Sequence, residues 1–386
     1  MPDTLTMTPL RRAGLRMLSL ALLLSLTLWL SGCGGGATAA PNDLTDPVAV
    51  ALAATNDRIN LGQQIFTDAN LSEPRGTACA ACHQANMGFA GNHGGRNGEA
   101  VGGLFWDGRA DSAELQALGP LLNPLEMNNL SKKSVVDKIA QSRYAALFRQ
   151  VFGADIFANT DAAFTSIGVA IAAFERARLQ PFSSKYDAMV RGQTTLSPTE
   201  ARGMALFMEP TKGNCAGCHL MNPTSGKPED SAFSEFTYYA TGIPRNPAIP
   251  KNADPAFYDL GLCGPDRAPP TLPDSVAPGV TISNFCGQFR MPTLRNVAER
   301  PAFMHNGFFR NLTEVVRFYS SRNSDPLRWY GQAVSNDLPT QYLGNIEKVK
   351  APFNRAANAG PALSELEIAD IVAFLHTLSD GFTAAP

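Results

Sequence analysis

The chain has 386 residues, enough for two ordinary domains. Its formal net charge is -2, and no basic stripe or charged tail is present, which argues against a nucleic-acid-binding protein. Gly (33) and Pro (28) are frequent and indicate a chain rich in loops.

The first 32 residues have the features of an export signal. Three arginines, Arg11, Arg12 and Arg16, precede the apolar run 18–30, which is too short to span a membrane comfortably. LSGC (30–33) follows and resembles a bacterial lipoprotein signal, with cleavage before Cys33 and lipidation of its thiol. The alternative is an ordinary secretory signal with a chance cysteine. We therefore expect a periplasmic, lipid-anchored protein with a signal peptide over 1–32 and a flexible tether over 33–55.

A faint internal repeat follows. LGQQIF (61–66) precedes CAACH (79–83), and RGMALF (202–207) precedes CAGCH (215–219). In each copy a Gly lies four residues before a Phe, one helical turn apart. Each copy therefore predicts a short helix that leads into a cysteine-containing turn.

Three helices can be read in more detail. Ser197, Pro198 and Glu200 predict an N-cap, a first turn and a capping box. Apolar residues recur at three- and four-residue spacing over 162–179 and over 364–378. No alternating strand pattern extends over more than a few residues. We expect a mainly α protein with long loops and a domain boundary near 192–197.

The five-residue pattern C-x-x-C-H is the attachment signature of c-type haem. The thiols of Cys79 and Cys82, and those of Cys215 and Cys218, would form thioethers with the two vinyl groups of a porphyrin. His83 and His219 would then ligate the iron. A zinc site or a redox dithiol is the alternative, but the two copies lie far apart in the sequence and an adjacent His adds nothing to dithiol exchange. The sequence therefore predicts two covalently bound haem c groups.

The remaining cysteines, Cys263 and Cys286, lie in a Pro-rich segment of an exported protein. An oxidising compartment favours a disulfide between them. The alternative is two buried free thiols.

Five further segments carry a family resemblance. They are FWDGRA (105–110), LQALGP (115–120), LLNPLEM (121–127), RMPTLRN (290–296) and MHNGFF (304–309). Together they resemble the bacterial di-haem cytochrome c peroxidase superfamily, including its MauG-like branch, over about residues 56–380. The resemblance implies two cytochrome c-like domains: a peroxidatic haem domain at 56–194 and an electron-transfer haem domain at 195–382.

The resemblance also implies roles for single residues. Trp106 matches a tryptophan between the two haems, a plausible stepping stone for electrons. Gln116 and Glu126 match the glutamine and glutamate of the distal pocket, and Pro120 matches its wall. A carboxylate there can move a proton between the two oxygens of peroxide. Without the resemblance, Trp106 would read as a core residue and Glu126 as an exposed loop acid.

The sixth ligand of the C-terminal haem gives a sharper expectation. In the family this ligand lies fourteen residues beyond the histidine of the MHNG-like motif, which here leads from His305 to Tyr319. Electron-storing peroxidases tend to carry methionine at this position, whereas the MauG-like branch carries tyrosine. A thioether favours reduced iron and a phenolate favours oxidised iron. The alternative is a tyrosine simply packed in a helix over 312–319.

The segment 84–104 departs from the family pattern because it is short. Arg96 and Asn97 echo a motif that helps to bind calcium between the domains, but no proline follows. Asn97 is a candidate calcium ligand. His93 either caps the N-terminal iron or lies exposed between glycines. His376 falls off the apolar face of its helix and is expected to be solvated.

We therefore expect a di-haem peroxidase that reduces hydrogen peroxide to water. Its electrons would come from a small c-type cytochrome or a cupredoxin. One alternative is MauG-like oxidation of a protein or organic substrate through a high-valent haem. Another is an electron-transfer lipoprotein without catalysis, which the small pool of spare histidines disfavours because both irons would need a sixth ligand.

Overall fold

The computed structural model describes residues 47–84, 103–178, 181–267 and 278–383. Within these ranges the protein is mainly helical with little sheet, as expected. The α-helices of the described residues are α1 (Pro47–Phe66), α2 (Cys79–Cys82), α3 (Ala113–Leu122), α4 (Lys132–Ala140), α5 (Ala145–Phe152), α6 (Thr160–Arg178), α7 (Lys185–Val190), α8 (Pro198–Met208), α9 (Leu312–Ser321), α10 (Pro326–Tyr330) and α11 (Glu365–His376).

The two short strands β1 (Tyr238–Tyr239) and β2 (Phe289–Arg290) pair antiparallel, with Tyr238 opposite Arg290. The expected signal peptide and Cys33 lie outside the described residues. No helix in the described ranges combines the length and the apolar character needed to cross a bilayer.

The helix predicted over 61–66 is the end of a longer helix. α1 begins at Pro47, so residues 47–55, which we expected to belong to the tether, form its first turns. The reason is local: PVAVALAATNDR contains no Gly and is rich in Ala, the best helix former, whereas the glycines of the tether lie earlier.

The other predicted helices are confirmed. α6 covers 162–178 of the expected 162–179, residue 179 lying outside the described residues, and α9 covers 312–319. Ser197 caps α8, with Glu200 completing a capping box, and Ser364 and Glu367 form the same box at α11. His376 is exposed at the end of α11, as expected.

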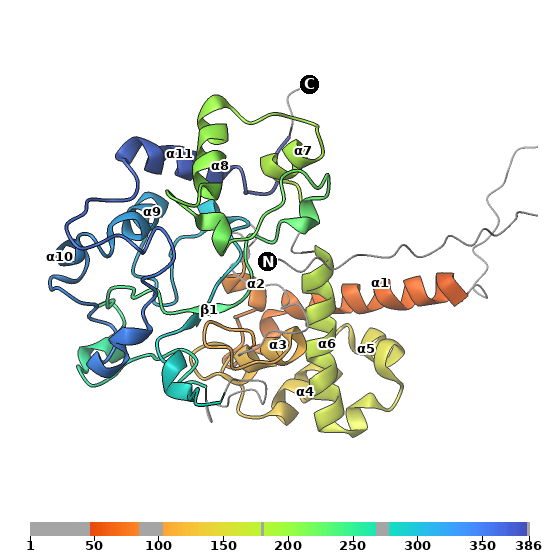
Figure 1. Ribbon diagram of the computed structural model, residues 1–386. Coiled ribbons are helices and arrows are strands. Elements are labelled where there is room, and N and C mark those ends of the chain that lie inside the picture. The colour runs from red at the N-terminus through yellow and green to blue at the C-terminus, as the bar shows by residue number, and fades with distance from the viewer. Residues whose placement is uncertain (1–46, 85–102, 179–180, 268–277, 384–386) are drawn as a thin grey trace, which may run out of the picture.

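The buried hydrophobic side chains form two main clusters, and the helices that contribute to each cluster lie together in the ribbon (Figure 1). The first joins α1 and α3–α6, and the second joins α7, α8, α9 and α11. α7 contributes Tyr186 and Val190 to the second cluster, although it precedes the domain boundary that we expected near 192–197.

Each cluster is built on a close helix crossing that uses the repeated glycine. A Cβ added at Gly62 of α1 would lie 2.0 Å from the carbonyl oxygen of Ala170 on α6. A Cβ added at Gly203 of α8 would lie 1.9 Å from the carbonyl oxygen of Asp370 on α11. One turn later, Phe66 packs against Phe174 and Phe207 packs against Phe374. The repeat seen in the sequence is therefore a repeat of helix packing.

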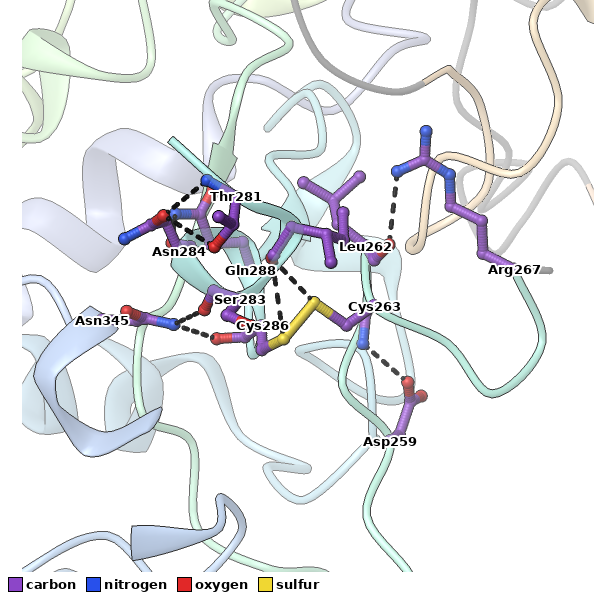
Figure 2. Close-up of a disulfide and its surroundings, with 12 residues drawn as sticks. Asp259, Leu262, Cys263, Arg267, Thr281, Ser283, Asn284, Cys286, Gln288 and Asn345 are labelled. Carbon is purple, nitrogen blue, oxygen red and sulfur yellow. Dashed lines mark hydrogen bonds between the residues drawn. A yellow bond between two sulfur atoms is a disulfide. The ribbon is translucent and has the colours of Figure 1, made fainter. Parts of the chain in front are cut away.

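Cys263 and Cys286 form the expected disulfide (Figure 2). Cys286 is 3% exposed and lies three residues before β2. Asn345 donates its side-chain amide to the carbonyl oxygens of Ser283 (2.8 Å) and Cys286 (3.0 Å), which anchors the same segment. The disulfide thus supports the chain that leads into β2.

We expect Gly203→Ala and Gly62→Ala to lower the free energy of unfolding by about 3 kcal/mol each, because the added methyl group meets backbone that cannot rotate away. Chemical denaturation measures this. Gly344→Ala is the matched control, since an added Cβ there has no neighbour within 4 Å. Equal stabilities of the Gly203 and Gly344 variants would contradict the role of the crossing.

We expect the double variant Cys263→Ala/Cys286→Ala to lower the free energy of unfolding by about 3 kcal/mol, because a loop of 23 residues gains freedom in the unfolded chain. Denaturation with and without a thiol reductant measures this. The reductant should weaken the wild-type protein and leave the double variant unchanged; an unchanged wild-type midpoint would count against the prediction.

Candidate functional site

The two C-x-x-C-H segments fold into the same kind of turn. In α2 the backbone N–H of His83 donates to the carbonyl oxygen of Cys79 (2.9 Å). In the 3-10 turn Cys215–Gly217 the N–H of His219 donates to the carbonyl oxygen of Cys215 (2.7 Å). Small spacers let each turn close tightly. The four thiols are free, whereas the other described cysteines form the disulfide.

The imidazole of His219 is held in one orientation. Its Nδ1 lies 2.9 Å from the carbonyl oxygen of Phe233, so Nδ1 carries the proton and donates it. Burial lowers the pKa of His219 to about 4, so the ring is neutral at physiological pH. A neutral imidazole with Nδ1 occupied presents Nε2 as a ligand, and a hydrogen bond of this kind fixes a metal-binding histidine.

A cavity of about 300 Å³ lies beside this second turn. Cys215, Cys218 and His219 line it on one side. Much of the rest of its lining is apolar and includes Phe207, Leu294, Val297, Phe303, Val316 and Leu375. The chemistry of this cavity, which is largely apolar and carries two thiols and one imidazole, fits a covalently attached porphyrin.

Tyr319 lines the same cavity from α9. Burial, with the charges of Cys215 and Cys218 acting in the same direction, raises the pKa of Tyr319. The phenol ring packs against Phe353, with ring centroids 5.0 Å apart. Tyr319 and His219 thus share the cavity, as a pair of ligands to one iron would have to.

Trp106 also lines this cavity, although it comes from the first half of the chain. Its carbonyl oxygen accepts a hydrogen bond from the backbone N–H of Arg290 in β2 (2.8 Å). Close by, the hydroxyl of Tyr238 in β1 donates to the carbonyl oxygen of Gly103. The small sheet therefore holds the FWDGRA segment against the second site.

The first turn lies at the end of α1. Phe66 contacts the His83 ring, with centroids 6.3 Å apart. Burial raises the pKa of the Cys79 thiol to about 12, and the negative charges of Glu175 and Glu126 act in the same direction. The first site therefore has carboxylates on α6 and on the loop after α3 close to its first thiol.

Gln116 and Glu126 lie on either side of the end of α3. Gln116 is half-buried on the helix, and Glu126 is exposed in the loop that follows it. The Oε1 atom of Glu126 accepts a hydrogen bond from the side-chain amide of Asn123 (2.6 Å). Neither residue lines the cavity at the second turn. The candidate residues thus divide between two places, with Glu126 at the first turn and Trp106 and Tyr319 at the second.

Glu175 is a residue that the sequence did not single out. It is half-buried on α6, and burial raises its pKa to about 7. The only available signal was an acidic residue directly after Phe174 in a helix whose neighbouring positions pack in the core.

His93 and Asn97 lie outside the described residues. His305 is held in place by stacking on Phe289, with ring centroids 3.4 Å apart. Burial lowers the pKa of His305 to about 3, so the ring is neutral. Phe289 and His305 both line the cavity at the second turn.

Three cationic side chains also line this cavity: Arg290, Arg300 and Lys350. The Arg290 guanidinium lies over the Phe236 ring. Lys350 donates a hydrogen bond to the hydroxyl of Tyr239, and this hydroxyl donates to Glu235. Burial lowers the pKa of Arg300 to about 10. Sequence reasoning missed this set, because loops far apart in the chain bring it together.

This protein is mainly helical and has two separate C-x-x-C-H turns, one of which faces an apolar cavity. These features make it a candidate di-haem c-type protein. Comparison with known proteins narrows this class. The family described as di-haem cytochrome c peroxidase matches residues 56–195.

Three relatives illustrate the likeness. The methylamine utilization protein MauG of Paracoccus denitrificans is 30% identical over 401 residues, covering 94% of this chain and 96% of that protein. The cytochrome c551 peroxidase of Nitrosomonas europaea is 29% identical over 76% of this chain and 81% of its own length. A crystal structure of a tyrosine-to-methionine variant of the diheme peroxidase BthA from Burkholderia thailandensis is 36% identical, with a TM-score of 0.76, over 84% of this chain and 86% of that one.

The chain belongs to the di-haem cytochrome c peroxidase family. The family resemblance read from the five sequence segments is thereby confirmed.

Proposed function

We propose that this protein is a di-haem c-type peroxidase that reduces hydrogen peroxide to water with electrons from a small periplasmic redox protein. The observation that carries the proposal is the cavity lined by Cys215, Cys218 and His219 together with Tyr319 and Trp106. The matching turn at Cys79–Cys82 and His83, and relatives named as peroxidases, support it.

Each site would hold one haem c. Cys79 and Cys82, and likewise Cys215 and Cys218, would form the thioethers, and His83 and His219 would supply the proximal nitrogen. When bound, the haems would supply iron that accepts peroxide and electrons one at a time. The proposal keeps two cytochrome c-like domains, 56–194 and 195–382. α7 belongs to the first range by its residue numbers but packs on the second hydrophobic cluster.

Peroxide would react at the first site. Glu126 has one carboxylate oxygen held by Asn123, which leaves Oε2 to take a proton from one peroxide oxygen and return it to the other. The side-chain amide of Gln116 would hold the peroxide by hydrogen bonding without competing for protons. Two protons and two electrons then convert one peroxide into two molecules of water.

Trp106 would connect the two sites. Trp106 lines the second cavity although it belongs to the first half of the chain, and the hydrogen bond from Arg290 fixes its backbone there. An indole at such a junction suits electron transfer. Tyr319 would be the sixth ligand at the second site, where its oxygen would favour oxidised iron.

The donor would be a small c-type cytochrome or a cupredoxin. The proposal keeps a periplasmic location, with a lipid anchor at Cys33, and a calcium ion to which Asn97 would contribute; both residues lie outside the described ranges. His93 would cap the N-terminal iron in a resting state.

A second candidate function keeps the site and changes the reductant: oxidation of a protein or organic substrate. The likeness to MauG over nearly the whole chain, together with a tyrosine in the cavity, favours it. Membership of an enzyme family disfavours a purely electron-transferring protein.

We expect the mature protein to carry two covalent haems by mass spectrometry and to oxidise a reduced donor cytochrome when peroxide is added. Glu126→Gln should lower the turnover number about a hundredfold, because the proton shuttle is lost. Rapid-mixing absorbance measurements would follow the donor.

Glu73→Gln is the control for this variant. Glu73 is an exposed carboxylate whose backbone N–H donates to Met127, directly beside Glu126, and its removal should leave turnover unchanged. Peroxide-dependent covalent change in a partner protein without consumption of the donor would favour the second candidate function. Fewer than two haems would contradict both.

We expect Tyr319→Phe to change the absorption and paramagnetic spectra of one haem only, and Tyr319→Met to raise its reduction potential, because a thioether favours reduced iron. Tyr330→Phe is the control: its hydroxyl donates to the carbonyl oxygen of Gly242 (2.6 Å), and the residue does not line the cavity. Identical spectra for wild type and Tyr319→Phe would refute ligation by Tyr319.

A further inference from the structure

The guanidinium of Arg300 is held at the wall of the second cavity. Arg300 directly follows the 3-10 turn Val297–Glu299 and lines the cavity. Its Nη2 donates to the carbonyl oxygens of Thr293 (2.9 Å) and Arg295 (3.2 Å), which fixes the side chain. Its Nε is buried and donates to no atom of the described residues.

This charge has no counter-ion among the described residues. Arg295, five residues earlier, is buried and shows the usual arrangement, because its Nη1 lies 3.0 Å from a carboxylate oxygen of Asp187. No carboxylate of the described chain makes such an ion pair with Arg300, and burial is the one cause that acts on its pKa. Arg300 is half-buried and its Nε is fully buried without an acceptor within the described ranges, and a cation held in this way without a counter-ion is costly, so the complete protein is expected to supply an anion at this point.

The position of Arg300 within the cavity indicates which anion this is. Its positive charge acts on the imidazole of His219. Arg300 lines the same cavity as Cys215, Cys218 and His219. The carboxylates that a covalently attached porphyrin would bring into this cavity are its propionates. In haem c the thioethers form along one edge of the porphyrin and the two propionates leave from the opposite edge.

We propose that Arg300 binds a propionate of the haem attached at Cys215 and Cys218, with Nε as hydrogen-bond donor and the guanidinium as counter-ion. This inference rests on the proposed haem attachment. A charge-assisted hydrogen bond between arginine and a carboxylate is among the stronger polar contacts in proteins. The pair would keep the propionate ionised, and the guanidinium beside the proximal imidazole would favour the reduced state of that iron.

The direct test is a crystal structure of the full chain with both haems attached. A propionate oxygen within hydrogen-bond distance of Arg300 Nε is the expected result. Both propionates in solvent, or bound only to other side chains, would overturn the proposal. This measurement needs no variant and so does not depend on how a substitution affects folding.

The second test is a redox titration of the holoprotein over neutral pH. In Arg300→Gln the potential of one haem should fall, and it should fall further as pH rises, because the unpartnered propionate has a raised pKa and ionises in this range. Arg300→Lys, which keeps the charge, should restore most of the wild-type potential. Arg310→Gln, an exposed arginine, is the control and should match wild type.

An unchanged potential and pH profile in Arg300→Gln, with two haems counted by mass, would overturn the inference. Peroxidase activity retained in that variant would show that the proposed function survives this failure. If the wild type lacks the second haem, the proposed function fails first.

Discussion

The close crossing of two helix pairs is the constraint on which the rest of the structure depends. Gly62 lets α1 approach the backbone of α6, and Gly203 lets α8 approach α11. A single turn of C-x-x-C-H is far too short to be stable alone, because helix nucleation costs more than one hydrogen bond returns. The phenylalanine one turn beyond each glycine packs on the partner helix and also reaches the site: Phe66 contacts His83, and Phe207 lines the second cavity. Each turn is thus positioned by a helix pair.

The second site needs a further support, because its cavity is walled mainly by loops. β2 contributes Phe289 and Arg290 to the wall, and β2 is itself held by pairing with β1 and by the disulfide just before it. The backbone of Arg290 then fixes Trp106. A two-residue strand has little stability of its own, so the covalent cross-link compensates for the small amount of regular structure there. This explains why a helical protein rich in loops carries a disulfide at this point.

Local signals predicted much of the fold. The capping residue Ser197 acts within one turn, so the sequence alone predicted where α8 begins, and apolar spacing over 364–378 predicted α11. The start of α1 was missed because residues 47–55 were assigned to the tether after the signal peptide, although this segment is rich in Ala and favours a helix. The attachment cysteines and Tyr319 followed from spacing and resemblance. Glu175 and Arg300 could not be found in this way, because each acts on a residue that lies far away in the sequence. The charge of Glu175 acts on Cys79, and the charge of Arg300 acts on His219.

These missed residues reveal an electrostatic difference between the two sites. The carboxylates of Glu175 and Glu126 act on Cys79, whereas the charged residues that line the second cavity are mainly cationic: Arg290, Arg300 and Lys350 against Glu347. Negative charge near a haem favours the oxidised state and provides groups that can carry protons, whereas positive charge favours the reduced state. With haems attached as proposed, the two sites would therefore be suited to different tasks although their C-x-x-C-H turns are alike. As the proposed iron ligand, Tyr319 would oppose this trend at the second site, and Arg322, whose charge acts on Tyr319, would make an anionic oxygen there less costly. With the haem attached as proposed, the redox balance of the second site would be set by a competition between the Tyr319 phenol and the arginines around it.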